Sequence, residues 1–235
     1  MKKFMKKICI SYLSHGEDDL RDLELSSEFI NRTTFLKENC DVFVHNDNDS
    51  LSNEKLMNSI NFDNFKCLLR TPQTFPVKPS GWSCGWAIGL SNHFEKFLEY
   101  ELVISLTCDV YIIDENLIVN LLREELTSDN SFVVSHFPES SQGDTYYGLD
   151  FFMFKPNKIR NIFSEINHNN PINDPMAPEY WIFKKLNSEN INFRKIKRGN
   201  TALLHQIDNY SLLHTHHHWV AESILKGENP NHFPY

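Results

Sequence analysis

Glycine is scarce in this sequence, and the motifs that depend on it are missing. Only 8 of the 235 residues are glycine, whereas a globular chain averages about 7%. The sequence contains no collagen-like repeat, no GxGxxG dinucleotide fingerprint and no Walker phosphate-binding pattern. A collagen-like protein is therefore excluded, and neither of the two nucleotide-binding motifs explains the few glycines that are there.

Long apolar runs and paired cysteines are missing too. No stretch approaches the roughly 18 apolar residues of a membrane span. The apolar run after the basic N-terminus covers residues 8–13, which is shorter than the core of about 7–15 residues in a secretory signal. The five cysteines are widely spaced and contain no CxxC pair, as in free thiols of a reducing compartment. We expect a cytoplasmic protein, for which peripheral contact with a membrane stays open.

An excess of basic residues is also lacking. Lysine and arginine number 23 against 31 aspartates and glutamates, a net charge of −8. A surface that follows nucleic-acid phosphates is normally basic, so we expect no nucleic-acid partner. Apolar residues make up 40% and charged residues 23% of the chain, in the range of soluble globular proteins.

Strand-like and helix-like segments alternate along the chain, and this order predicts the fold class. Strands are expected at 8–13, 41–45, 66–70, 101–106, 132–136, 149–154, 193–196 and 201–204, with 109–113 extending the strand at 101–106. Helices are expected at 18–36, 51–60, 83–98, 114–126, 156–166, 179–186 and 219–225. We expect one α/β domain over residues 1–235, Rossmann-like, with a mixed, mostly parallel central sheet flanked by helices.

The loops after the strands are the candidate site. In open α/β sheets, ligands bind beyond the carboxyl ends of the strands. This rule selects the loops at 14–17, 45–49 and 107–109 and the chain from 136 onward. Ser14, His15 and Asn46 are candidate ligand contacts there. Asn46 and Asp47 follow a strand and contact a nucleoside in one interpretation, or form a plain turn in the other.

Three of the eight glycines fall within nine residues, at 81, 85 and 89. Glycine where a loop enters a helix lets a ligand or another backbone approach closely, and the free N–H groups there can meet an anion. Gly81, Trp82 and Gly85 are therefore candidate cofactor-binding residues. Tight packing of this helix on the sheet is the alternative explanation.

Asp109 follows an apolar strand that is expected to be central. A carboxylate in that place is costly to desolvate alone, so it is solvated, paired or bound to a metal, unless it only forms a turn. The run Leu106-Thr107-Cys108-Asp109-Val110 resembles the DxD region of GT-A glycosyltransferases, with Thr107 at the first acidic position and Asp109 at the second. The resemblance covers roughly residues 8–154 in element order.

The resemblance implies a donor and a metal. GT-A enzymes use nucleotide-sugar donors, and a divalent cation such as Mn²⁺ or Mg²⁺ can bridge the donor diphosphate. Asp109 would be a metal ligand, and Thr107 would lie beside the donor. The chain would then divide into a nucleotide-sugar-binding part at about 1–113 and a part that closes over the acceptor and the metal at about 114–235.

Histidines collect near the C-terminus, where five of the 11 lie between residues 205 and 218. Imidazole is the commonest side chain on transition metals. Because many GT-A enzymes return a C-terminal histidine to the metal, the resemblance implies His214 or His216 as a further ligand. A zinc-hydrolase site is the second interpretation, although no HExxH spacing supports it. A solvated or packed polar loop is the third.

Two acidic residues are candidates for catalysis. Asp150 enters the apolar strand at 149–154, where the resemblance implies contact with the donor sugar or the acceptor; capping of a neighbouring backbone N–H is the alternative. Glu179 begins a helix, as a partner of the helix dipole or as a catalytic base. An inverting transferase needs such a base, whereas a retaining one does not, and the sequence does not decide between them.

The sequence therefore predicts an enzyme of glycan biosynthesis: a metal-dependent glycosyltransferase that moves a sugar from a nucleotide-diphosphate-sugar donor to a glycan or small-molecule acceptor. A non-catalytic nucleotide-sugar-binding module on the same fold is the alternative, because Thr107 removes one carboxylate. A zinc-dependent hydrolase that uses the C-terminal histidines is the third hypothesis.

Overall fold

The computed structural model describes residues 7–47, 51–71, 81–136, 147–164, 166, 178–197, 205–207, 212–215 and 217–228. At 81–87, 136, 147, 178–179, 197, 205–207 and 212–214 it describes the backbone alone. The predicted strand at 201–204 lies outside these residues.

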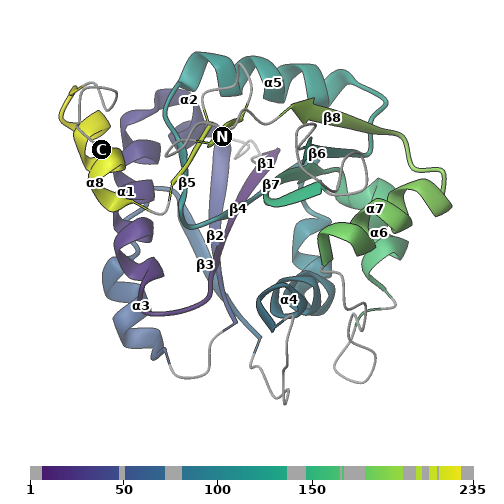
Figure 1. Cartoon of the computed structure of the whole chain (residues 1–235), viewed down its shortest axis with the longest axis horizontal. Helices are drawn as coiled ribbons and strands as arrows, with labels where there is room; N and C mark the ends of the chain where they lie inside the picture. The colour runs from purple at the N-terminus through teal and green to yellow at the C-terminus, as the bar shows by residue number, and fades with distance from the viewer. Residues whose placement is uncertain are drawn as a thin grey trace, which may run out of the picture.

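A seven-stranded sheet organises the described residues (Figure 1), in the order β3-β2-β1-β4-β7-β6-β8. Its strands are β1 (Ile8–Ser14), β2 (Cys40–Asn46), β3 (Phe65–Arg70), β4 (Leu102–Thr107), β6 (Phe132–His136), β7 (Tyr147–Phe154) and β8 (Phe193–Lys197). Only β7 runs antiparallel to its neighbours in this sheet. The prediction of a mixed, mostly parallel sheet is confirmed.

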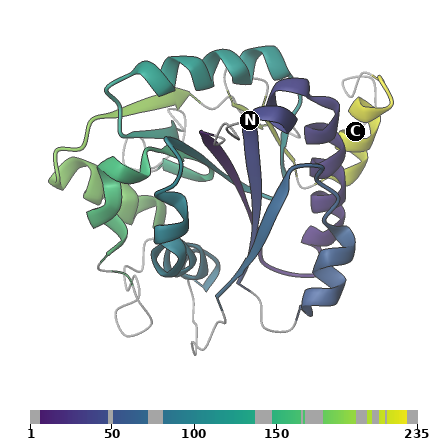
Figure 2. The same ribbon diagram turned by 180° about the vertical axis from the view of Figure 1, so that it is seen from behind.

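Helices cover both faces of the sheet, which explains why every residue of β1 is buried. One apolar cluster joins one face to α1 (Asp19–Arg32), α2 (Thr34–Asn39), α3 (Asn53–Ser59) and α5 (Glu115–Thr127). A second cluster joins the other face to α4 (Gly81–Phe97), α6 (Pro156–Phe163) and α7 (Pro178–Ser188). Figures 1 and 2 show the two groups of helices on either side of the strands.

The predicted helix at 18–36 is wrong in one respect, because the chain breaks it at Thr33. This residue has an extended backbone (φ −94°, ψ 120°), which separates α1 from α2. The Thr33 hydroxyl donates to the carbonyl of Ile30 at 2.7 Å, and such a local side-chain bond competes with continued helix. The Asp114 cap of α5 is confirmed, since its carboxylate accepts from two backbone N–H groups.

The predicted extension of the central strand at 109–113 is also wrong. The chain turns at residues 108–109, and β5 (Val110–Ile112) joins a second sheet of order β5-β10-β9. There it pairs with β10 (Leu212–His214), which pairs in turn with β9 (His205–Ile207), both antiparallel. After β10 the chain forms α8 (His218–Leu225), which lies beside α1 in both views.

Candidate functional site

The carboxyl ends of β1, β2 and β4 meet at one edge of the sheet. The parallel register places Ser14 beside Asn46, and Leu13 beside Thr107. The predicted loop at 14–17, which follows β1, therefore lies between Asp47, which follows β2, and the predicted loop at 107–109, which follows β4. In open α/β sheets this edge is where ligands bind.

His15 and Asp47 form a hydrogen-bonded pair at this edge. His15 Nδ1 lies 2.9 Å from Asp47 Oδ2, and the backbone N–H of His15 donates to the Asp19 carboxylate at the start of α1. Burial lowers the pKa of His15, but the carboxylates of Asp47 and Asp19 outweigh it, so that the pKa is raised above its ordinary value. The imidazole therefore holds its proton more tightly than a free histidine.

Two polar atoms at this edge are buried without a partner among the described residues. They are the Ser14 hydroxyl oxygen and Asp47 Oδ1, on side chains that are 0% and 1% exposed. Asn46, which is also 0% exposed, donates through Nδ2 to the Leu51 carbonyl at 3.5 Å. Buried polar atoms are nearly always satisfied, so the two orphaned oxygens mark a place where a hydrogen-bond donor fits.

Thr107 and Asp109 are bonded to each other across the turn that ends β4. The Thr107 hydroxyl donates to Asp109 Oδ1 at 2.6 Å. At the first position of the DxD-like run, the threonine thus orients the carboxylate at the second position instead of supplying a second carboxylate.

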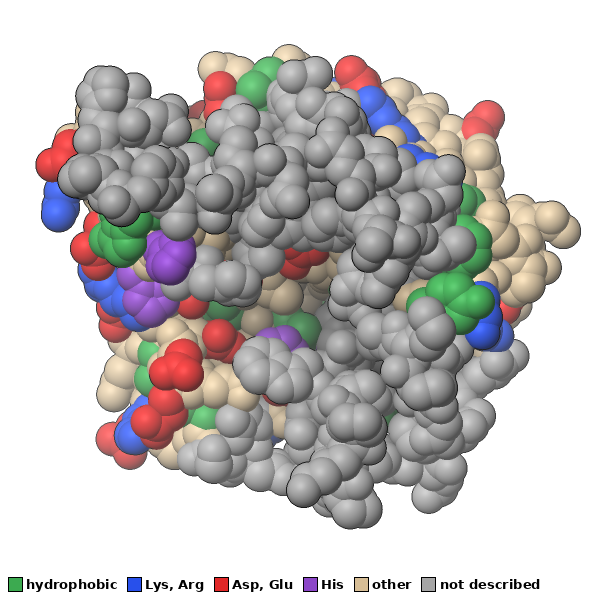
Figure 3. All heavy atoms as spheres, in the orientation of Figure 1, with side chains coloured by type: hydrophobic (Ala, Val, Ile, Leu, Met, Phe, Trp, Pro, Cys, Tyr) green, Lys and Arg blue, Asp and Glu red, His purple; other side chains and the backbone are tan. Residues whose placement is uncertain are grey.

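Negative charge accumulates around the Asp109 turn. Burial raises the pKa of Asp19 and of Asp22, and the charge of Asp109 raises both further. Figure 3 shows histidine and acidic side chains next to one another on the face that α1 and α8 present. A site with this field favours a cation over a further anion.

The C-terminal histidine segment returns to Asp109. His214 pairs with Val110 in the β5–β10 ladder, and the backbone N–H of the buried Thr215 donates to the Asp109 carbonyl at 3.1 Å. The sequence places these residues about 100 positions apart, and the structure makes them neighbours. The side chain of His214 and the whole of His216 lie outside the described residues, and within those residues no three His, Cys, Asp or Glu side chains form a group that could hold a metal ion.

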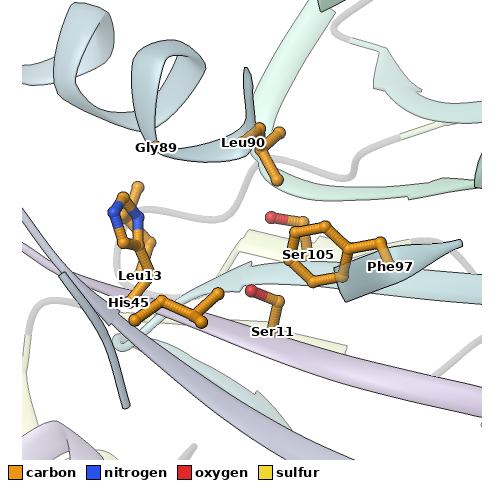
Figure 4. Close-up of a pocket in the computed structure, with 8 residues that line it drawn as sticks. Ser11, Leu13, His45, Gly89, Leu90, Phe97 and Ser105 are labelled. Atoms are coloured by element: carbon orange, nitrogen blue, oxygen red, sulfur yellow. The ribbon is translucent and has the colours of Figure 1, made fainter. Parts of the chain in front are cut away.

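In α4, which carries Gly81, Gly85 and Gly89, packing against the sheet explains the glycine at position 89. A Cβ on Gly89 would lie 1.7 Å from Cε1 of His45, a side chain that is 5% exposed. Figure 4 shows His45 beneath α4, beside a cavity of about 10 Å³ into which Ser11 and Ser105 also point, room for about one water molecule. Burial lowers the pKa of His45 to about 4, and its Nε2 lies 3.0 Å from the Thr71 hydroxyl. His45 therefore belongs to the core, not to the candidate site loop at 45–49.

The other predicted residues of this helix are only partly placed. Gly81, Trp82 and Gly85 lie within the first turns of α4, and their side chains are outside the described residues. The close approach at Gly89 favours packing for that glycine, and the anion-binding hypothesis stays a prediction for the first turn.

Asp150 reaches the same edge from the antiparallel strand β7. Phe151 pairs with Leu106 in this antiparallel ladder, so the residue before it, Asp150, lies level with Thr107, and its side chain is half-buried there. Glu179 is the second residue of α7, on the helix-covered face opposite α1. Its side chain is outside the described residues, and nothing brings its backbone to the Asp109 turn.

Sequence reasoning missed three members of this region: Asp19, Asp22 and Tyr111. None of them was predicted as a site residue. A signal was present, because Asp22 precedes Leu23 within the apolar stripe of α1, where an unpaired carboxylate would be costly.

The fold is similar to those of two solved structures, a transferase and a synthase. A protein from Desulfovibrio desulfuricans G20, assigned as a nucleotide-diphospho-sugar transferase, matches with a TM-score of 0.53 and 11% identity, over 82% of this chain and 80% of that one. The 4-diphosphocytidyl-2C-methyl-D-erythritol synthase from Anaerococcus prevotii DSM 20548 matches with a TM-score of 0.56 and 9% identity, over 94% and 96%. No protein-family model and no curated sequence matches the chain.

These likenesses establish a fold and no more, because the identities are low. The chain has a GT-A-like fold, a Rossmann-like α/β domain with a mixed sheet, as the DxD-like run predicted. None of the helices in the described part of the chain is long and apolar enough to cross a membrane.

Proposed function

We propose that this protein is a glycosyltransferase that takes a sugar from a nucleotide-diphosphate-sugar donor and transfers it to a glycan or small-molecule acceptor. One observation carries the proposal. The ends of β1, β2 and β4 and the returning C-terminal segment meet around the Asp109 turn, beside two buried oxygens that have no hydrogen-bond partner among the described residues.

The nucleoside would bind between the first two strand ends. Asp47 Oδ1 and the Ser14 hydroxyl can accept hydrogen bonds from base N–H groups or ribose hydroxyls, which would satisfy both atoms. Asp47 is held in place by His15 at 2.9 Å. A hydrogen bond to a buried polar atom that has no partner removes an unfavourable desolvation term, and this gain would contribute to the binding energy.

A divalent cation would lie next to Asp109. Carboxylate oxygen is the ligand that Mg²⁺ and Mn²⁺ prefer, Thr107 fixes the carboxylate of Asp109, and the surrounding acidic groups make the field favourable. His214 or His216 would complete the ligand set from the β10 side. When bound, the cation stabilises the charge that develops on the diphosphate leaving group.

Asp150 is the proposed contact to the donor sugar or the acceptor, because it lies level with Thr107 at the same edge. Glu179 is retained as an alternative base. Its helix lies on the other face of the sheet, so Asp150 is the better supported of the two.

The test is thermal stabilisation by nucleotides. We expect UDP or GDP with Mn²⁺ to raise the Tm of the wild type. At a ligand concentration of 100 times Kd, the unfolding free energy should rise by roughly 2.7 kcal/mol. Asp109→Ala should lose the Mn²⁺-dependent part. Asp63→Ala is the matched control, because Asp63 is an exposed aspartate whose partner Lys37 is also exposed. No shift with any nucleoside diphosphate would refute the proposal.

Two alternatives differ from glycosyl transfer in what they release. A binding module, favoured by the single carboxylate of the DxD-like run, would bind nucleotide without releasing any product. Nucleotidyl transfer is the other, since the synthase from Anaerococcus prevotii shares the fold over 94% of this chain. A nucleotidyl transfer from a triphosphate releases pyrophosphate, whereas a glycosyl transfer releases a nucleoside diphosphate, so product analysis separates the three.

A further inference from the structure

Asp22 is a buried carboxylate that connects three elements of the chain. It lies on α1 and is 5% exposed. The hydroxyl of Tyr111, from β5, donates to Asp22 Oδ1, and Nε2 of His218, the first residue of α8, lies 3.0 Å from the same oxygen. One carboxylate oxygen thus binds the two elements that flank the returning C-terminal segment.

This network is not replaceable by solvent. A buried carboxylate is tolerated only when it is paired and hydrogen-bonded, and burial raises the pKa of Asp22. Burial and the Asp22 charge also raise the pKa of Tyr111, so its phenol keeps the proton that it donates. Removing His218 would leave the carboxylate with Tyr111 as its only partner among the described side chains.

The rest of α8 is held along α1 by apolar packing and by exposed polar contacts. Val220 and Ala221 pack with Leu25, Phe29 and Tyr111 in a small apolar cluster separate from the main core. On the outside, Arg21 forms an ion pair with Glu222 at 2.6 Å, and Arg32 donates to the Leu225 carbonyl at 2.7 Å. Exposed ion pairs of this kind contribute little, so the buried Asp22 contact is the stronger constraint.

His218 follows the histidine segment directly. Between β10 and α8, the backbone N–H of His217 donates to the Thr215 hydroxyl at 3.1 Å, and Thr215 itself donates to the Asp109 carbonyl. His218 therefore lies three residues after Thr215, whose N–H is bonded to Asp109.

We propose that Asp22 and His218 are positioning residues: their contact holds the backbone of residues 212–215 against the Asp109 turn, next to the proposed cation site. This inference rests on the proposed function for its ligand, but not for its geometry. It assigns Asp22 and His218 no contact with donor or acceptor.

The experiment measures the geometry and the ligand separately in His218→Ala and His218→Gln, the latter retaining a side-chain N–H toward Asp22. Hydrogen–deuterium exchange of residues 212–215 should be about tenfold faster in His218→Ala, with β1 unchanged. The dissociation constant for Mn²⁺ alone should rise about tenfold, as when outer-shell partners of metal ligands are removed. His218→Gln should restore much of both. Arg21→Ala, which loses only the exposed ion pairs with Glu222 and Glu24, should leave both near wild type.

Unchanged exchange at 212–215 in His218→Ala, or an equal increase in Arg21→Ala, would overturn the inference. Faster exchange with unchanged Mn²⁺ affinity would overturn the link to the cation. If the wild type binds no Mn²⁺, the metal is removed from the proposed function, whereas the exchange comparison still decides whether His218 holds the segment.

Discussion

Alanine at Gly89 is the most informative single substitution in the fold, because it tests whether the glycine helix is shaped by packing. The new Cβ would lie 1.7 Å from Cε1 of His45, 2.4 Å from Nε2 and 2.6 Å from Nδ1. No rotation of a methyl group relieves such contacts, so the ring or α4 must move. The hydrogen bond between His45 and Thr71, 3.0 Å long, is the first interaction at risk.

The magnitude follows from competing terms. Alanine is favoured over glycine in a helix by about 1 kcal/mol, whereas overpacking costs about 1–3 kcal/mol and a lost hydrogen bond about 1 kcal/mol. We expect Gly89→Ala to lower the free energy of unfolding by about 2 kcal/mol. For a chain of this size that is a fall in Tm of roughly 4–8 °C.

Denaturant unfolding of a double-mutant cycle is the assay. His45→Ala removes the ring, so Gly89→Ala should cost much less in that background, with a coupling energy of about 1 kcal/mol or more. Gly227→Ala is the control, since no atom lies within 4 Å of its added Cβ and only its backbone, at φ +79°, is affected. Its cost should not depend on His45. A Gly89→Ala protein as stable as the wild type would refute the reasoning.

Three further predictions follow from the site and its supports. Thr107→Ala should weaken Mn²⁺-dependent nucleotide binding several-fold, because the Asp109 carboxylate loses its 2.6 Å hydrogen bond, whereas Thr107→Ser should retain it; calorimetric titration checks both. His15 has a raised pKa, so the stability that it contributes is complete below its unfolded pKa of about 6.5 and is lost as the pH rises through the folded pKa. The difference in unfolding free energy between wild type and His15→Gln should therefore shrink from about pH 5.5 to about pH 8.5, and a growing difference would contradict the sign. Asp114→Ala should lower the unfolding free energy by about 1 kcal/mol, because Asn116 and Leu117 lose their cap at 2.9 and 3.2 Å, as thermal denaturation would show.

The strands were predictable because their signal is local. Residues 8–13 and 101–106 are apolar runs buried on both faces, and the structure extends or shifts each by one residue. The cap at Asp114 is equally local, since one side chain and the next two or three N–H groups decide it.

The site was predictable only in outline. The rule about strand ends selected loops that the structure brings together, but the pairing of His15 with Asp47 depends on the parallel register of β1 and β2, which no local pattern specifies. His45 was selected with the site loop but does not belong to it. Side chains along β2 alternate between the two faces of the sheet, and this alternation places His45 under α4 and not toward the site.

The C-terminal segment was the hardest part to predict. Strand β10 contributes only Leu212 and Leu213 as apolar residues, too short a run to indicate a strand. Its partner β5 lies about 100 residues earlier, and the turn at Cys108 and Asp109 that directs β5 away from the main sheet is set by long-range pairing. The resemblance to GT-A enzymes predicted that a C-terminal histidine returns to the metal, and the β5–β10 ladder places the backbone of His214 beside Val110.

The central claim is that a nucleoside diphosphate and a divalent cation bind at the edge formed by β1, β2 and β4. The most direct measurement is anomalous diffraction from crystals soaked with Mn²⁺ and a nucleoside diphosphate. The account predicts a manganese peak within bonding distance of an Asp109 carboxylate oxygen, with the nucleoside against Ser14 and Asp47. A nucleotide bound elsewhere, or a manganese peak with no contact to Asp109, would contradict it.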